Sequence, residues 1–126
     1  MKIQESAENY LEMILMLGLR QPYVRSIDIA NELGFSKPSV SVAMKNLRTQ
    51  GHILVDENGH ITLTASGRQI AETIYERHTA LSEWLSRLGV DKKTAAEDAC
   101  RIEHVISAES FAAIKRHIQN TNGISR

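Results

Sequence analysis

The sequence predicts a mainly α-helical fold, in which a winged helix-turn-helix with a two-stranded β wing precedes a helical second domain. Three observations carry this prediction. Apolar residues recur at helical spacing along most of the 126-residue chain. Two short helical segments meet at Gly34, and alternating apolar residues flank Asn58-Gly59. We expect residues 1–64 to form the first domain and residues 65–126 the second.

The first two helices are expected on the N-terminal side of Gly34. Apolar residues at i, i+3, i+4 and i+7 predict a helix over residues 5–18, with Gly18 as its stop. The second helix begins at Ser26, whose hydroxyl can cap it, and Gly34 provides a left-handed end. Its inward face is expected to hold three apolar residues, Ile27, Ala30 and Leu33.

A third helix over residues 36–48 is the expected recognition helix. Ser36 is a natural N-cap, and Pro38 lies in the first turn, where its missing amide proton is not needed. The residues that face the core are expected to be Val40, Met44 and Leu47.

A β hairpin with its tip at residues 56–60 is expected to form the wing. Ile53 and Val55 alternate with polar residues before the tip, and Ile61 and Leu63 do so after it. The dipeptide Asn58-Gly59 favours a type I′ turn, in which both central residues have positive φ.

The helical domain is expected to begin after Thr64, a second capping residue. A helix over residues 65–88 carries a long apolar stripe, and a histidine, His78, interrupts it. The stripe consists of Ile70, Ile74, Leu81, Leu85 and Leu88. Further helices are expected over residues 92–106 and 108–117, with a frayed tail over the last six residues.

The composition limits the possible partners and the compartment. Lys and Arg number 15 and Asp and Glu also number 15, so any binding to nucleic acid must come from a local patch. The sequence contains no run of ~18 or more apolar residues, the length that spans a membrane, so we expect no membrane partner. Cys100 is the only cysteine and cannot form an intramolecular disulfide, which favours a reducing cytoplasm.

The expected recognition helix provides such a local basic patch. Residues 36–48 contain Lys37, Lys45 and Arg48 but no acidic residue, and short hydroxyl side chains near the helix N-terminus suit phosphate and base edges. Val42 could contact a thymine methyl group. A solvated helix face with small side chains is the alternative interpretation. The residues expected to contact DNA are Ser36, Lys37, Pro38, Ser39, Ser41, Val42, Lys45, Asn58 and Gly59.

Three potential metal ligands, Cys100, Glu103 and His104, fall within five positions of the fifth expected helix. Residues three and four apart share a helix face, so this trio should border the buried stripe of that helix. The stripe is expected to hold Ala95, Ala99, Ile102 and Ile106. By itself so short a motif is equally consistent with a charged surface.

Further ligands are expected from other helices. His78 interrupts an otherwise regular apolar stripe, although a lone histidine there is more often a hydrogen-bonded core residue. Asn9 and Glu12, at i and i+3 on the first helix, could supply oxygen ligands.

Several motifs together resemble one family along essentially the whole chain. They are ENYLEMI in the first helix, SKPSVS in the recognition helix, LTASGR after the wing and CRIEH in the fifth helix. In these motifs the chain is similar to the family of the diphtheria toxin repressor and the manganese transport regulator. The resemblance implies a metal-dependent bacterial repressor that binds operator DNA as a homodimer, in the short form without a C-terminal barrel.

The resemblance also implies a ligand set. In the family, the residues at the positions of Asn9, Cys100, Glu103 and His104 bind one metal ion. In its manganese branch, the residues at the positions of Glu12 and His78 bind a second one, and a shared carboxylate bridges the two ions.

This sequence departs from both branches of the family at two ligand positions. The family has Asp or Met where this chain has Asn9, and Cys100 follows the iron branch, since the manganese branch carries a carboxylate there. A thiolate is a soft ligand, so we expect Fe(II) to be preferred, with Mn(II) and Zn(II) as alternatives. Val42 replaces a polar residue of the family, so the operator sequence does not follow from the resemblance.

Two rival functions remain open at this stage. One is a winged-helix regulator that responds to a small organic ligand, or to redox state through Cys100. The other is a metalloenzyme with Glu103 as general base, which we do not expect because every candidate acid is better used as a ligand. We expect no organic cofactor, and the expected pairing surface of the homodimer consists of Trp84, Leu88, Ile106 and Phe111.

Overall fold

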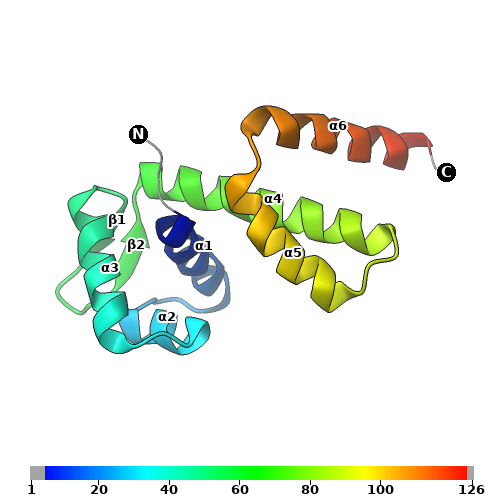
Figure 1. Ribbon diagram of the computed structural model, residues 1–126. Coiled ribbons are helices and arrows are strands. Elements are labelled where there is room, and N and C mark those ends of the chain that lie inside the picture. Colours follow the sequence, from blue (N-terminus) through cyan, green and yellow to red (C-terminus); the bar gives the residue numbers. More distant parts are fainter. Residues whose placement is uncertain (1–4, 125–126) are drawn as a thin grey trace. The chain divides into compact units, whose positions relative to one another are not determined.

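Figure 1 shows the chain as a computed structural model, which describes residues 5–124. The described chain is mainly α-helical with one two-stranded antiparallel sheet, which confirms the expected fold class. The elements are α1 (Glu5–Arg20), α2 (Ser26–Leu33), α3 (Lys37–Thr49), β1 (Ile53–Val55), β2 (Ile61–Leu63), α4 (Ala65–Arg87), α5 (Lys92–Val105) and α6 (Ala108–Ile124). Two compact units divide between Thr73 and Ile74, within α4. None of the described helices is long and apolar enough to cross a lipid bilayer.

Helix α1 contributes a row of buried apolar side chains to the core of the first unit. Leu11, Ile14 and Leu17 are at most 3% exposed, as their spacing predicts. The expected stop at Gly18 is wrong, because the helix continues to Arg20 and Gly18 does not adopt a positive φ. Glycine therefore lies inside this helix without ending it.

Helix α2 differs from the prediction at its start and in its buried face. The backbone N–H of Arg25 donates to the Asp28 carboxylate at 2.9 Å, so Arg25 is the N-cap and Ser26 is already helical. Ala30 is buried as expected, but Ile29 is fully buried in place of Ile27, which is exposed. Gly34 has a φ of 71° and ends the helix as expected.

Helix α3 forms as predicted from its first residues. The Ser36 hydroxyl accepts a hydrogen bond from the backbone N–H of Ser39 at 3.3 Å, and Pro38 lies in the first turn. The expected core residues of this helix are all buried, namely Val40, Met44 and Leu47. The cap and the apolar spacing thus aim the opposite, basic face of α3 outward.

The hairpin forms with Val55 paired to Ile61, but its turn is not the expected type I′. Within the described chain no residue other than glycine has a positive φ, so Asn58 does not adopt the conformation that a type I′ turn requires. The N–H of Gly59 donates to the Asp56 carbonyl at 3.0 Å, and Gly59 has a φ of 80°. The loop is therefore a turn followed by a left-handed glycine, and Asn58 occupies an ordinary turn position.

The start of α4 is fastened to the start of the wing. Thr64 caps α4 as expected, accepting from the N–H of Gly67 at 3.2 Å, and its hydroxyl donates to the Gly51 carbonyl at 2.7 Å. The Thr64 N–H donates to the His52 carbonyl at 3.1 Å. A side chain on Gly67 would overlap that same carbonyl oxygen. This close approach requires glycine at position 67.

The second unit consists of the rest of α4 with α5 and α6, which run back and forth against one another (Figure 1). Its fully described core is small and holds Leu81 of α4, Ala99 of α5 and Phe111 of α6. Helix α6 extends to Ile124, so the expected end at His117 is wrong. Phe111 is 7% exposed within one chain, which removes it from the expected pairing surface.

We expect Gly67→Ala to destabilise the protein by about 1–3 kcal/mol, because the added methyl group displaces the backbone of His52. Gly18→Ala is the matched control, since nothing lies within 4 Å of its added Cβ and its backbone is helical. That variant should be neutral or more stable by up to about 1 kcal/mol. Urea unfolding of both variants measures the difference, and equal stability of the two would contradict the close approach.

Candidate metal centre and DNA-binding surface

Helix α5 carries the candidate metal ligands and is capped by Asp91. The Asp91 carboxylate accepts from the backbone N–H groups of Lys93 at 3.1 Å and Thr94 at 3.4 Å. One line along this helix, at i, i+4 and i+8, is completely buried and consists of Ala95, Ala99 and Glu103. Glu103 thus lies inside the buried face, whereas the sequence had placed it beside that face.

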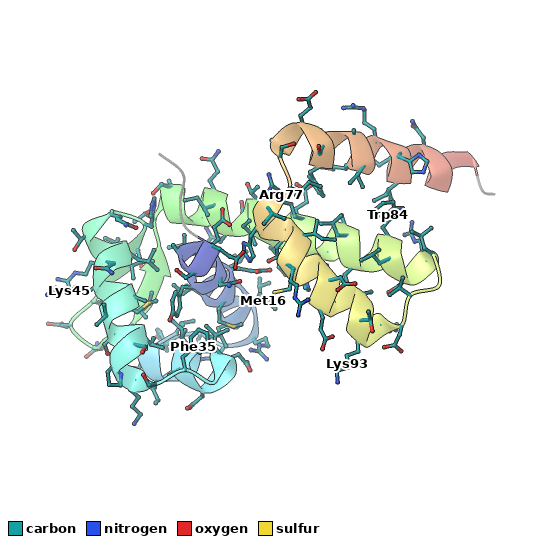
Figure 2. All side chains as sticks on the ribbon, viewed as in Figure 1. Met16, Phe35, Lys45, Arg77, Trp84 and Lys93 are labelled. Carbon is teal, nitrogen blue, oxygen red and sulfur yellow. The ribbon has the colours of Figure 1, made fainter. Side chains whose placement is uncertain are left out.

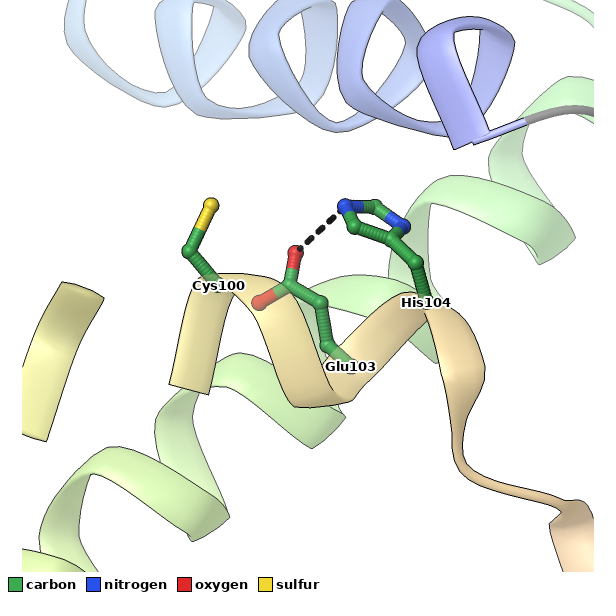
Figure 3. Close-up of side chains that lie close together, drawn as sticks. All are labelled: Cys100, Glu103 and His104. Carbon is green, nitrogen blue, oxygen red and sulfur yellow. Dashed lines mark ion pairs between the residues drawn. The ribbon is translucent and has the colours of Figure 1, made fainter. Parts of the chain in front are cut away.

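The trio of Cys100, Glu103 and His104 does converge. One ligand atom from each residue lies within 4.8 Å of the others. Figure 3 shows the three side chains rising from one side of α5, with the carboxylate between the thiol and the imidazole. Cys100 is exposed, whereas the side chain of His104 is 2% exposed.

His78 joins this group from α4. Its Nδ1 lies 2.8 Å from Glu103 Oε1, which is hydrogen-bonding distance. If Nδ1 carries the proton, it donates to the carboxylate and leaves Nε2 as the ring's acceptor or ligand atom. The second unit therefore brings together four of the six predicted ligands, His78, Cys100, Glu103 and His104.

The second carboxylate oxygen of Glu103 indicates what the group could bind. Oε2 is buried and lies 3.4 Å from His104 Nε2, yet it makes no hydrogen bond. A buried carboxylate oxygen without a hydrogen bond is unfavourable unless a cation compensates it. A thiol, a carboxylate and imidazoles are also the donor set of divalent transition metals. These residues fit a metal ion of that class.

Asn9 and Glu12 lie one turn apart on α1, in the first unit. Glu12 is 7% exposed and Asn9 is half-buried. Their role as metal ligands remains a prediction that rests on the sequence.

The exposed face of α3 is the candidate DNA-binding surface. Lys37, Lys45 and Arg48 are all exposed, and no acidic residue interrupts them along the helix. Figure 2 shows Lys45 extending away from the helix into solvent. Val42 is 61% exposed, so an apolar group also lies in this basic surface. This combination suits phosphate and base edges.

The two serines at the start of α3 share their hydrogen bonds. The Ser36 hydroxyl donates to the Ser39 hydroxyl at 2.8 Å while it accepts from the Ser39 N–H. Ser36 is thus occupied as a cap, and the proton of the Ser39 hydroxyl is directed elsewhere. Of the two, Ser39 is better placed to donate to an incoming phosphate.

Three residues beside the wing were not predicted from the sequence. The ring of Tyr23 stacks on His60 with centroids 4.3 Å apart, and Arg25 Nη2 lies 3.2 Å from His60 Nε2. The N–H of Ile61 also donates to the Val24 carbonyl at 2.7 Å. These contacts join segments that are far apart in the sequence, so no local sequence pattern predicts them.

Profiles of one family match both halves of the chain. The N-terminal DNA-binding domain of iron-dependent repressors matches residues 2–61, and their metal-binding and dimerisation domain matches residues 64–122. The transcriptional regulator MntR of Escherichia coli O6:H1 is 34% identical over 116 residues, which cover 92% of this chain and 75% of that regulator. The chain belongs to the iron-dependent repressor family.

Members of this family are metal-dependent transcriptional regulators, which confirms the resemblance inferred from the motifs. The regulator MntR of Lysinibacillus sphaericus is 30% identical over 114 residues, with 90% of this chain and 82% of that regulator covered. Rival functions that depend on an organic ligand or on redox sensing are not favoured by these similarities.

Solved structures show the same fold. A manganese-dependent transcriptional repressor in complex with manganese has a TM-score of 0.81 at 30% identity, with 90% of this chain covered. IdeR of T. acidophilum has a TM-score of 0.76 at 28% identity, with 93% covered. The chain spans about half the length of these two proteins, 52% and 55% respectively.

We expect the wing turn to depend on pH through Asp56. Its carboxylate accepts from the backbone N–H groups of His60 at 2.9 Å and Asn58 at 2.8 Å. The His60 N–H bond, with a smaller effect from Asn58, lowers the pKa of Asp56 below its ordinary value of 3.8. Because the folded-state pKa is lowered, the stabilisation is fully present above the unfolded pKa and is lost as the pH falls through the folded pKa.

Titration by NMR checks this expectation. The amide signals of Asn58 and His60 should shift together, with a midpoint below 3.8. Asp56→Asn keeps an acceptor oxygen but not the charge, so it should abolish the shared titration. A midpoint at or above the ordinary aspartate value would show that the turn hydrogen bonds do not form in solution.

Proposed function

We propose that this protein is a metal-dependent repressor that binds operator DNA as a homodimer when its metal centre is loaded. The observation that carries the proposal is the convergence of Cys100 and His104 on the buried carboxylate of Glu103. Family membership supports it, since the matching domains are named for DNA binding and for metal binding and dimerisation. We place the protein in the cytoplasm, because its operator DNA would be there.

The proposed ligands in the second unit are Cys100, Glu103, His104 and His78. A bound divalent metal would supply positive charge to compensate the Glu103 carboxylate. Thiolate from Cys100 favours Fe(II) over Mn(II), because softer ligands bind the later first-row metals better. We therefore propose Fe(II) as the physiological ion and keep Mn(II) and Zn(II) as alternatives for the measurement to decide.

Asn9 and Glu12 are proposed as further ligands on the resemblance alone. Ligands drawn from α1 and from the helical unit would limit the freedom of the winged unit in the loaded protein. Restricting a protein to its binding-competent arrangement raises its affinity in proportion to the gain in that population. A coupling of about 1–3 kcal/mol, or roughly 5- to 150-fold in DNA affinity, is ordinary for such a switch.

The proposed DNA contacts come from α3 and from the tip of the wing. Lys37 and Lys45 would bind phosphates, and Ser39, Ser41 and Val42 lie on the exposed face that would meet base edges. Two copies of α3 in a dimer would read half-sites about 34 Å apart, one turn of DNA. Asn58 and Gly59 would contact the backbone beside the recognition site.

The proposed pairing surface lies on the second unit. Leu88 and Val105 are 65% and 77% exposed, and the half-buried Trp84 and Ile106 pack against the small core of that unit. Isolated exposed apolar residues are common on monomers, so the proposal of a homodimer rests mainly on the matching dimerisation domain.

We expect Cys100→Ala to weaken metal binding by more than about tenfold, because one ligand is lost and the buried carboxylate is compensated less well. Metal-dependent binding to operator DNA should weaken with it. Cys100→Glu is the matched variant, since it restores a charged ligand of harder character and should shift the preference from Fe(II) towards Mn(II).

Anaerobic titration with each metal, followed by a fluorescence assay of DNA binding, measures both effects. Chelator should abolish the binding of wild-type protein to operator DNA, whereas mild peroxide in the absence of metal should leave its low DNA affinity unchanged. The ligand assignment is wrong if Cys100→Ala titrates like the wild type. If Cys100→Glu keeps the wild-type ratio of Fe(II) to Mn(II) affinity, the thiolate does not set the metal preference.

We expect Lys37→Ala to weaken DNA binding and to lower the slope of log K against log salt by about 1, the value for one lost phosphate contact. Lys93→Ala is the control, because Lys93 is equally exposed but belongs to α5, outside the proposed DNA surface. Binding measured across a range of KCl concentrations gives both slopes. An unaltered slope in Lys37→Ala would remove Lys37 from the phosphate contacts.

A further inference from the structure

We infer that Arg77 is a positioning residue of the metal centre, holding Glu103 in place from α4. This inference rests on the proposed metal-dependent function. Arg77 Nη1 donates to the carbonyl oxygen of Glu103 at 3.1 Å and to that of Ile106 at 3.0 Å. The next residue along α4, His78, holds the Glu103 side chain at 2.8 Å. Two consecutive residues thus hold the same glutamate by its main chain and its side chain.

The hydrogen bonds from Arg77 satisfy carbonyl groups at the end of α5. The last carbonyls of a helix have no intrahelical donors, and α5 ends at Val105. Ile106 turns to an extended conformation with φ −75° and ψ 138°, so the chain beyond it leaves the helix. The cationic guanidinium replaces the missing donors and also complements the negative end of the helix dipole.

The surroundings of Arg77 satisfy its guanidinium only in part. The guanidinium carbon lies 5.7 Å from the centre of the Phe111 ring, where a cation–π contact is favourable, but Nε is buried and has no hydrogen-bond partner. Burying a donor of a charged group without a hydrogen bond is unfavourable. We infer that the benefit of Arg77 comes from its hydrogen bond to the backbone of Glu103, a proposed metal ligand.

The consequence is that the carboxylate of Glu103 is fixed before any metal arrives. The hydrogen bond from Arg77 fixes the position of the Glu103 backbone along α4, and the hydrogen bond with His78 orients its carboxylate. Removing a residue that hydrogen-bonds to a metal ligand and orients it commonly lowers metal affinity by about 10- to 100-fold. Figure 2 shows Arg77 at the place where α4 meets the end of α5.

The test compares Arg77→Met with Arg77→Lys and uses Arg87→Met as the control. Arg87 lies on the same helix and in the same unit, and its ion pair with Glu83 at 3.7 Å is exposed. Co(II) is the probe, because its visible spectrum reports both the affinity and the ligand geometry of a site with a thiolate. Arg77→Met should bind Co(II) about 10- to 100-fold more weakly and with altered d–d bands at saturation. Arg87→Met should match the wild type, and Arg77→Lys should recover part of the affinity because the ammonium can still donate to both carbonyls.

A measurement on metal-free protein separates positioning from a general loss of structure. Amide hydrogen exchange should accelerate in Arg77→Met around Glu103 to Ser107 and stay unchanged in α1 to α3. If that variant does not fold, the wild-type protein decides: Zn(II) should shift the side-chain N–H signals of Arg77 and leave those of Arg87 in place.

Two outcomes overturn the inference. One is a folded Arg77→Met that binds Co(II) with wild-type affinity and spectrum, and the other is Zn(II) binding that leaves the Arg77 signals unmoved. The failure of the proposed function looks different, since wild-type protein would then bind no Co(II) and would bind operator DNA equally well in the presence of chelator.

Discussion

The second unit depends on one buried charge, the carboxylate of Glu103. It lies at the third position of a buried line whose other members are alanines, and its exposed fraction is zero. Moving a carboxylate out of water is costly unless partners replace the lost hydration. His78 replaces part of it at one oxygen, whereas the other oxygen has no hydrogen bond. A unit built only for stability would place an apolar side chain here, so the carboxylate indicates a cation.

The candidate sites of the two units differ in how far apart their residues lie in the sequence. The DNA-binding surface is local, because a capping serine, a proline in the first turn and a run of residues without acids all lie within α3. The candidate metal centre is not local, because it needs α4 and α5 to meet in one register, and Arg77 and Glu103 are 26 residues apart. The packing of Leu81 against Ala99 and Phe111 contributes to bringing those helices together.

The same difference in range explains which predictions succeeded. The helices, the hairpin, the cap at Ser36 and the buried line of α3 follow from spacing and capping chemistry, and all were predicted. The turn type was not, because the Asp56 carboxylate accepts hydrogen bonds from the backbone N–H groups of Asn58 and His60 and stabilises a turn without positive φ at Asn58. In α2, Ile29 rather than Ile27 is buried, and Arg25 rather than Ser26 is the N-cap.

The metal ligands show the limit of reasoning from periodicity. The motif around Cys100 predicted a trio that borders the buried stripe, but it did not predict that Glu103 lies completely inside the buried face. Arg77 was missed although it lies three residues after Ile74 and four before Leu81, both of which are buried. A charged residue at a core position of an apolar stripe is the signal that would have found it, because such a residue must be hydrogen-bonded in the fold.

This arrangement bears on how one metal could be selected over another. Affinity at a given donor set rises from Mn(II) through Fe(II) to the later metals, so affinity alone would favour the wrong ions. Selection must then come from geometry, and the two ends of the trio differ in burial. Glu103 is held at its backbone by Arg77 and at its side chain by His78, whereas Cys100 is exposed at the edge of the group. In the proposed site, the buried and oriented carboxylate would define the position of the ion, while the exposed thiol would influence which ion is preferred. In the proposed site, position 100 would therefore tune the preference among metals, and position 103 would decide whether a metal binds at all.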